Sequence, residues 1–185
     1  MTQPKKPRQK NIKLTDIQKQ YKKVNTYKTH ILNEKENKVI RYYEVFDETR
    51  IQELIKEAYE DVVYAEENGL NTFKDVGDVS GDMKFIKYIY FLIIKHMTEL
   101  KNEIVGNLEE KSRLFNQIEA IGLFHELMEN VFLPEEVSKV LERVGNFALL
   151  ANQMTEKEKE ERQKALESVQ HPLMKKKLEE GMNNA

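Results

Sequence analysis

The sequence predicts a mainly α-helical protein: a compact helical domain around one buried central helix, with a single small β-hairpin and a charged helical tail at the C-terminus. Residues 82–102 include the most apolar stretch of a chain in which 34% of the residues are charged, and they contain neither Gly nor Pro. A helix that is apolar on nearly all sides is a buried one. Elsewhere, apolar residues recur at the spacing of amphipathic helices, and strand-like sequence is confined to about 26–46.

The first eleven residues predict a disordered basic arm, because they hold two prolines, four Lys or Arg residues and almost no apolar side chain. Residues 1–30 contain nine Lys or Arg and one acid, a net charge of +8, which leaves −10 for the rest of a chain of net charge −2. Such asymmetry indicates an electrostatic contact. The cations predicted to bind a partner are Lys5, Lys6, Arg8, Lys10 and Lys13.

A short helix and a hairpin are predicted next. Thr15 and Gln18 have the spacing of a capping box, and Ile17, Tyr21 and Val24 share one side of the helix that would follow. Two runs rich in Thr, Tyr, Ile and Val, at 26–32 and 38–46, flank the turn-forming sequence NEKEN. This arrangement predicts an antiparallel hairpin that must pack against helices, because an isolated hairpin is marginally stable.

The remaining helices follow from their caps and periodicity. Asp47 is a good N-cap for a helix that ends at Asn68-Gly69, and the central helix follows after a glycine-containing loop. Helices are predicted at 108–121 and 123–132, separated by Gly122, and Pro134 suits the first position of a helix reaching about Asn152. The predicted domains are thus 1–11, 12–152, and a charged helical extension over 153–185 that starts near Thr155.

Composition excludes several classes of protein. The chain has no cysteine, so disulfides and thiolate chemistry are excluded and a cytoplasmic location is expected. No apolar run follows the N-terminal cations, so no signal peptide is expected. Lys84, Lys87, Lys95 and His96 interrupt the central helix too often for a membrane span, and no membrane partner is expected.

No catalytic residues, metal site or cofactor are predicted. His125 and Glu129 resemble part of a zinc-protease motif, but the second His one helical turn later is missing, which favours an exposed helix pair. Asp75 and Asp78 lie in a loop that lacks the bidentate Glu of a calcium-binding loop. Five aromatic residues near the basic arm in sequence could stack on bases: Tyr42, Tyr43, Phe46, Tyr59 and Tyr64. The positions of Tyr43, Phe46 and Tyr59 favour core packing instead.

A resemblance to a known family covers about 42–144 and is carried by three runs: YYEVFDETRIQELIKEAYEDV, YIYFLIIKHMTEL and IGLFHELMENVF. Their texture and order resemble the tail assembly chaperones of long-tailed phages of Gram-positive bacteria. The resemblance implies a non-enzymatic protein of the host cytoplasm. It also implies that the protein binds the apolar helices of the tape measure protein and keeps it soluble until tube subunits polymerise around it.

Two other functions stay open at this point. A structural or connector protein of the virion would be present in mature particles, whereas an assembly chaperone would be absent from them. A nucleic-acid-associated regulatory protein would use the basic arm, and its affinity would fall steeply with salt. Nucleic acid is the less favoured partner, and self-association is also possible.

Overall fold

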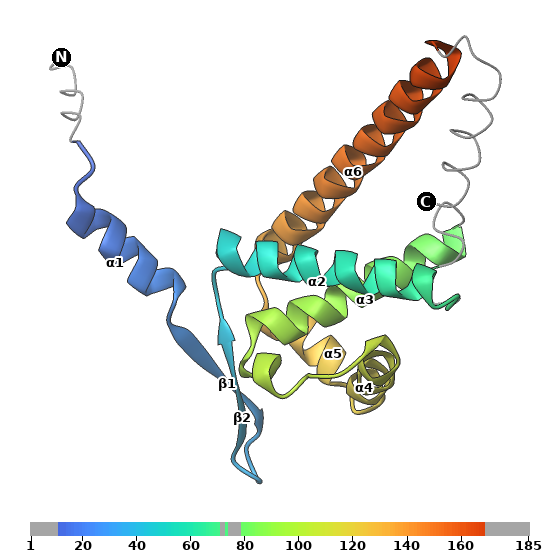
Figure 1. Cartoon of the computed structure of the whole chain (residues 1–185). Helices are drawn as coiled ribbons and strands as arrows, with labels where there is room; N and C mark the ends of the chain where they lie inside the picture. Colours follow the sequence, from blue (N-terminus) through green and yellow to red (C-terminus); the bar gives the residue numbers. More distant parts are fainter. Residues whose placement is uncertain (1–10, 71–72, 74–78, 169–185) are drawn as a thin grey trace, which may run out of the picture. The chain divides into compact units, whose positions relative to one another are not determined.

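The structure is a computed structural model that describes residues 11–70, 73 and 79–168. These residues are mainly helical and include one two-stranded antiparallel sheet, which confirms the predicted fold class (Figure 1). The chain divides into two compact units, Met1–Leu141 and Glu142–Ala185. None of the described helices is long and apolar enough to cross a membrane.

Helix α1, Leu14–Val24, and the predicted hairpin form the N-terminal part of the first unit. The prediction that Thr15 caps the helix is wrong, because the helix begins one residue earlier and the Asp16 carboxylate accepts from the Lys13 backbone N–H at 3.0 Å. Strand β1, Tyr27–Asn33, pairs antiparallel with β2, Lys38–Tyr43, and residues 34–37 form the turn between them, as predicted.

Helix α2, Glu48–Glu67, begins and ends where its caps predict. The Asp47 carboxylate accepts from the backbone N–H groups of Thr49 and Arg50, and Gly69 follows the helix with φ +64°. Tyr43 and Phe46 are buried as predicted, but Tyr59 is 52% exposed. Tyr59 is one position after the buried Ala58, about 100° around the helix, and so leaves the core-facing side.

The central helix α3, Val79–Met97, is buried as predicted: residues 91–94 and Met97 have no exposed surface. It ends about five residues earlier than expected. The buried Thr98 leaves the helix with an extended backbone, forms an isolated β-bridge with Tyr42, and donates its hydroxyl to the Ile94 carbonyl at 2.8 Å. The short 3₁₀ helix η2, Glu99–Asn102, follows this bridge.

After η2, helix α4, Leu108–Ala120, begins at a capping box: Asn107 and Glu110 each accept from the backbone N–H of the other at 3.0 Å. Leu114, Ile118 and Ile121 have the spacing of one helix side, but Ile121 does not join the buried Ile118. Ile121 is the C-cap residue and is 75% exposed. The helix predicted over 123–132 is two elements, α5, Leu123–Glu126, and a π-helical turn η3, Leu127–Val131.

Helix α6, Pro134–Ser168, starts at the predicted proline but does not break near Asn152. The segment from Asn152 to Ser168 is rich in Glu, Lys and Gln, which are good helix formers, and contains no Gly or Pro. Within the first unit, the first turns of α6 bind the chain after β2. Glu136 accepts from the Phe46 N–H at 2.8 Å, and Lys139 donates to the Phe46 carbonyl at 2.6 Å.

Gly106 occupies a backbone conformation that other residues rarely adopt, with φ +117°, and a Cβ there would lie 2.1 Å from the Glu110 carboxylate oxygen of the capping box. We expect Gly106→Ala to lower the free energy of unfolding by about 1–3 kcal/mol in urea denaturation. Gly145→Ala is the control, because it lies inside α6 with no heavy atom near its Cβ position. The control is expected to keep or raise stability; equal effects of the two would contradict the prediction.

Candidate partner-binding surface

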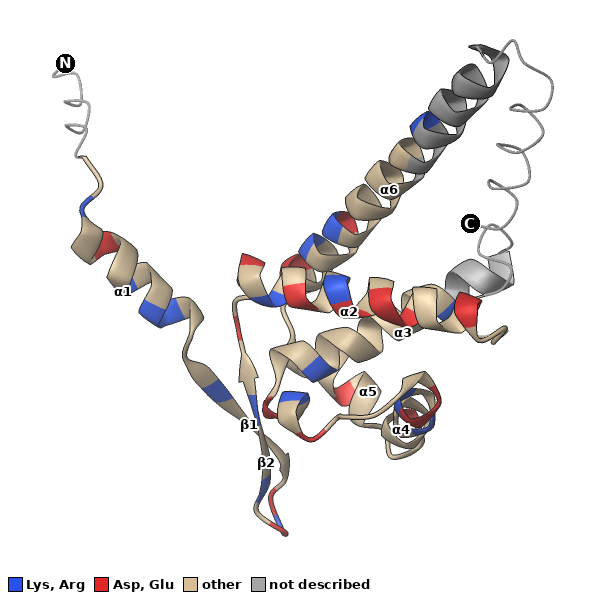
Figure 2. Cartoon of the chain, viewed as in Figure 1, with Lys and Arg blue, Asp and Glu red and all other residues tan. Residues whose placement is uncertain are grey.

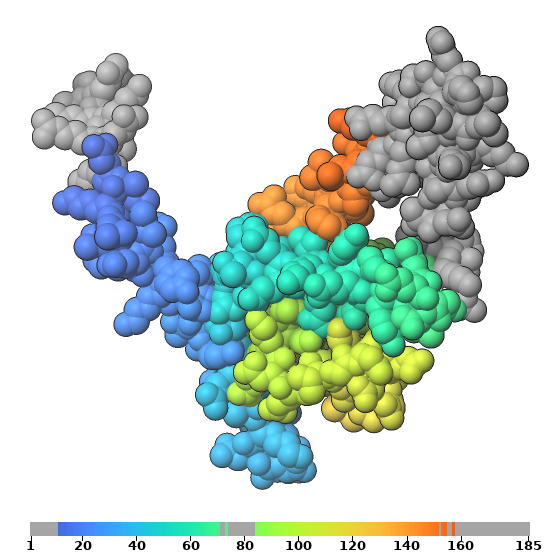
Figure 3. All heavy atoms as spheres, in the orientation of Figure 1, coloured from blue at the N-terminus to red at the C-terminus, as the bar shows by residue number. Residues whose placement is uncertain are grey.

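Helix α1 carries an apolar stripe that the described residues leave uncovered. Leu14, Ile17, Tyr21 and Val24 lie on one side of the helix, and we call them the α1 stripe. Leu14 is 69% exposed, Ile17 49% and Tyr21 64%, and no residue of α1 is buried. The helix, blue in Figure 3, has its side chains open to solvent on the face in view. An amphipathic helix normally buries its apolar side, so this one is available to a partner.

The α1 stripe is bordered by cations. At 100° per residue, Lys13 falls at one edge of the stripe, Lys22 and Lys23 fall about 80° and 100° beyond its two edges, and Lys19 falls on the opposite side of the helix. Asp16 is the one acid between Lys13 and Val24, so this segment has a net charge of +3 (Figure 2). A surface of this kind fits a partner whose apolar residues are flanked by acidic ones.

Exposed apolar side chains continue from α1 onto the hairpin. Among the described residues, eight of the 18 exposed large hydrophobic side chains fall between residues 12 and 39. They are Ile12, Leu14, Ile17, Tyr21, Tyr27, Ile31, Leu32 and Val39. Such a concentration in a short part of the chain is typical of an interaction surface.

The predicted partner-binding cations are only partly described. Lys5, Lys6, Arg8 and Lys10 lie outside the described residues. Lys13 is exposed, precedes α1 and lies at one edge of the α1 stripe. Partner binding by these five residues stays a prediction. The exposure of the stripe could not be read from the sequence, because the periodicity that predicts this helix is the same for a covered and an uncovered side.

A buried cluster of charges joins α2, α3 and α4. One carboxylate, that of Glu57, lies 2.6 Å from Lys95 Nζ, 2.7 Å from His96 Nε2 and 2.6 Å from Lys111 Nζ. Lys111 is also 2.6 Å from the Asp61 carboxylate, which accepts from the Tyr88 hydroxyl at 2.5 Å. We call these six residues the charge cluster: Glu57, Asp61, Tyr88, Lys95, His96 and Lys111.

The charge cluster shifts the pKa values of three of its members. Burial alone would raise the pKa of the Glu57 carboxyl, but hydrogen bonds from His96, Lys111 and Lys95 outweigh it and hold that pKa far below its usual range. Burial would lower the pKa of Lys111, but its bonds to Asp61 and Glu57 raise it. Burial and the bond to Asp61 raise the pKa of Tyr88.

The arrangement of the charge cluster is structural. The Glu57 carboxylate is held ionised by cations, because its pKa is lowered, and the raised pKa values of Tyr88 and Lys111 keep these two groups protonated near neutral pH. Sequence reasoning missed this cluster, although one signal was present. Lys95 and His96 lie within the most apolar helix, and a buried cation requires a partner.

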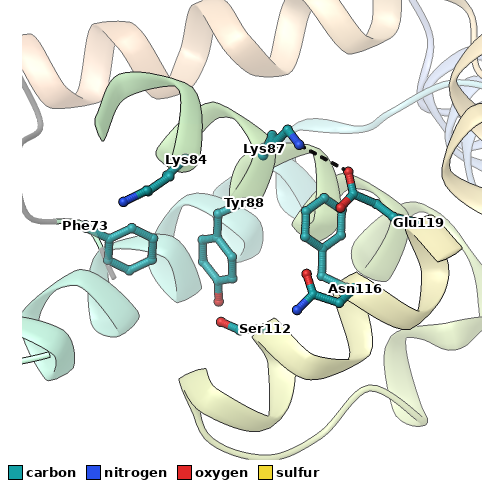
Figure 4. Close-up of a pocket in the computed structure, with 8 residues that line it drawn as sticks. Phe73, Lys84, Lys87, Tyr88, Ser112, Asn116 and Glu119 are labelled. Carbon is teal, nitrogen blue, oxygen red and sulfur yellow. Dashed lines mark hydrogen bonds and ion pairs between the residues drawn. The ribbon is translucent and has the colours of Figure 1, made fainter. Parts of the chain in front are cut away.

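An open pocket of about 340 Å³ lies beside the charge cluster, between α3 and α4 (Figure 4). Phe73, Tyr88 and Phe115 give it aromatic walls, and Lys87 pairs with Glu119 at 3.4 Å on its rim. The Tyr88 hydroxyl is committed to Asp61. The pocket has the size and lining to receive an apolar side chain, and its residues form no nucleophile–base pair.

The metal-like motif at His125 has the expected geometry of an exposed helix pair. His125 Nδ1 lies 3.4 Å from Glu129, and both side chains are more than two-thirds exposed. Within the described part of the chain, no three His, Cys, Asp or Glu side chains come together as metal ligands. Asp75 and Asp78 lie outside the described residues.

One protein family matches nearly the whole chain: the family model named YomO matches residues 14–181. The chain belongs to the YomO family. By its name the family is phage-associated, which supports the phage origin implied by the resemblance. The match includes the whole α1 stripe, whereas the predicted cations from Lys5 to Lys13 precede it. No curated protein and no solved structure matches the chain.

Proposed function

We propose that this YomO-family protein is non-enzymatic and binds apolar helices of another phage protein through the α1 stripe. The exposure of Leu14, Ile17 and Tyr21 on an otherwise charged helix carries the proposal. Full burial of one large apolar side chain contributes about 1.5–3 kcal/mol, so covering the α1 stripe supplies a substantial part of a binding free energy. The mode is helix against helix, with anchors at positions i, i+3 and i+7.

The chemistry of the partner follows from the edges of the α1 stripe. Lys13 at one edge of the stripe, with Lys22 and Lys23 beyond its two edges, favours a helix whose apolar residues are flanked by Asp or Glu. Helices of about 11 residues are marginal by themselves, so a partner that covers α1 also stabilises it. Reversible capture of aggregation-prone apolar helices is the work of an assembly chaperone.

The specific role that we propose is tail assembly. The partner is then the tape measure protein of the same phage, bound in the host cytoplasm before tube subunits polymerise around it. The resemblance over about 42–144 and the phage-associated family support this role. Co-expression with the tape measure protein should raise its soluble yield, and the two proteins should co-purify.

The paired substitution Ile17→Ser with Tyr21→Ser tests the α1 stripe. Both side chains are exposed, so the free energy of unfolding should change by no more than about 0.5 kcal/mol. The affinity for the tape measure protein should fall at least about tenfold, because two apolar anchors are lost. Calorimetry or pull-down from the co-expressing cells measures the loss.

Lys19→Ser with Lys23→Ser is the matched control, since it places two serines on the same helix but outside the α1 stripe. It should retain binding, with a slower association at low salt. Equal losses of partner affinity in the two double variants would contradict the α1 stripe as the binding surface.

Two other results would favour the alternative functions. Stoichiometric recovery of the protein from purified virions would favour the connector. Tight, salt-sensitive DNA binding with no effect on tape measure solubility would favour the nucleic-acid-associated protein.

A further inference from the structure

Strand β1 has an outer edge whose backbone groups point away from β2. The Arg41 N–H of β2 donates to the Glu99 carboxylate at 3.1 Å, so it points away from β1. Arg41 lies opposite Thr29, and this pair is therefore one that exchanges no backbone hydrogen bonds across the hairpin. Alternate residues of a strand share one direction, so the N–H and C=O groups of Tyr27, Thr29 and Ile31 all point to the outer edge of β1.

The two outer edges of the hairpin differ in their surroundings. The edge of β2 is covered by the bridge between Tyr42 and Thr98 and by the contact of Arg41 with Glu99. No hydrogen bond from elsewhere in the described residues reaches the outward backbone groups of β1. A two-stranded sheet is marginal in water, and an open edge is a template for another strand.

The side chains of β1 can form favourable cross-strand pairs with the same strand of a second copy of the protein. We propose that β1 pairs antiparallel with β1 of a second copy, with Thr29 on the two-fold axis, to form a four-stranded sheet. In this register Tyr27 lies opposite Ile31 of the second copy, an aromatic beside a β-branched residue, and Thr29 lies opposite Thr29. Tyr27 is 40% exposed and Ile31 56%, so both are accessible for this contact.

Neighbouring registers lose the pair between Tyr27 and Ile31 and bring identical polar side chains together. Moving the axis to Lys28 places two lysines opposite each other, and moving it to His30 places two histidines opposite each other. With the axis at Thr29, Lys28 lies opposite His30 of the second copy. Lys28 is already paired with Glu44, and His30 Nε2 lies 2.6 Å from Glu126, so these side chains carry their own counter-charges.

This dimer goes beyond the proposed function and stands on different residues. It gives one assembly two copies of the α1 stripe, so that two helices of a long partner are held at once with increased avidity. A lysine on an edge strand often prevents such pairing, but Lys28 is neutralised by Glu44. The register irregularity between Ile31 and Asn33 ends the regular edge at Ile31.

Single cysteines test the register directly, because the full chain contains none. Opposite residues that exchange hydrogen bonds have Cα atoms about 5.5 Å apart, within the range for a disulfide. Mild oxidation of Thr29→Cys should therefore give a covalent dimer. Ile31→Cys alone should not give a covalent dimer. In the proposed register the two copies of residue 31 are offset by four residues along the paired strands, a distance of roughly 13 Å. A mixture of Tyr27→Cys and Ile31→Cys should cross-link again.

Light scattering on the full-length protein provides the second measurement. The wild-type protein should have the mass of a dimer. The variant Thr29→Pro should have half that mass, because proline removes an outward N–H of β1 that β2 does not use. Its helical circular dichroism spectrum should be unchanged. The Ile17→Ser, Tyr21→Ser variant should remain a dimer, which separates this inference from the proposed function. A wild-type monomer, or equal cross-linking of Thr29→Cys and Ile31→Cys, would overturn it.

Discussion

Glu57→Gln is expected to lower the free energy of unfolding by about 3–5 kcal/mol, because it leaves the buried Lys95 without a carboxylate and removes one of the two that pair with Lys111. Lys95 and Lys111 each lie 2.6 Å from Glu57, and both are at least nine-tenths buried. A neutral amide accepts a hydrogen bond from one ammonium but offsets neither charge. Urea denaturation at neutral pH, followed by circular dichroism, measures the difference.

The control for this variant is Glu60→Gln, one helical turn away on α2 and 61% exposed in its pair with Lys56. It should change the free energy of unfolding by no more than about 0.5 kcal/mol.

The pH dependence shows whether the lost Glu57 charge causes the destabilisation. Since the pKa of Glu57 is depressed in the folded state, its contribution is present above the unfolded value of about 4.3 and is lost as pH falls toward the folded one. The difference between wild type and Glu57→Gln should therefore shrink below about pH 4. A constant difference down to pH 2 would contradict this account.

Ile93→Asp should unfold the protein or destabilise it by more than about 4 kcal/mol, because Ile93 has no exposed surface and the new carboxylate would be buried without a partner. Ile86→Asp is the matched control on the same helix α3. Ile86 is 44% exposed, so its substitution leaves the carboxylate in water. Thermal melting compares the two, and a wild-type melting temperature for Ile93→Asp would show that α3 is not the core of the protein.

Local signals predicted the parts of this fold whose causes are local. The turn sequence NEKEN, the Asp47 cap with its Asn68-Gly69 stop, and Pro134 at the start of α6 all lie where the sequence places them. The end of α3 had no such signal. Thr98 leaves the helix because Tyr42, more than fifty residues earlier, pairs with it, and a single sequence does not reveal that contact.

The candidate site was predicted less completely than the fold. The charge of the basic residues from Lys5 to Lys13 predicted a partner-binding segment. The α1 stripe has the same amphipathic pattern as any surface helix, so the sequence did not mark it as a binding surface. Whether Ile17 and Tyr21 are covered depends on whether another segment of the folded chain packs against α1, and this is a property of the tertiary structure. The charge cluster required three helices to converge, so the roles of Glu57 and Lys111 follow from tertiary structure alone.

The hydrogen bonds from the start of α6 to the Phe46 backbone affect the order in which the protein folds as it is synthesised. Phe46 is 1% exposed, and its N–H and carbonyl are bound by Glu136 and Lys139, which are made some ninety residues later. Helices α2 and α3 can pair as soon as both have left the ribosome. The Phe46 N–H and carbonyl at the junction between the hairpin and α2, however, have only water as a partner in place of α6 until the start of α6 arrives, so their burial has to wait for it. A nascent chain therefore remains open at that junction through most of its translation, and the late emergence of α6 closes the first unit.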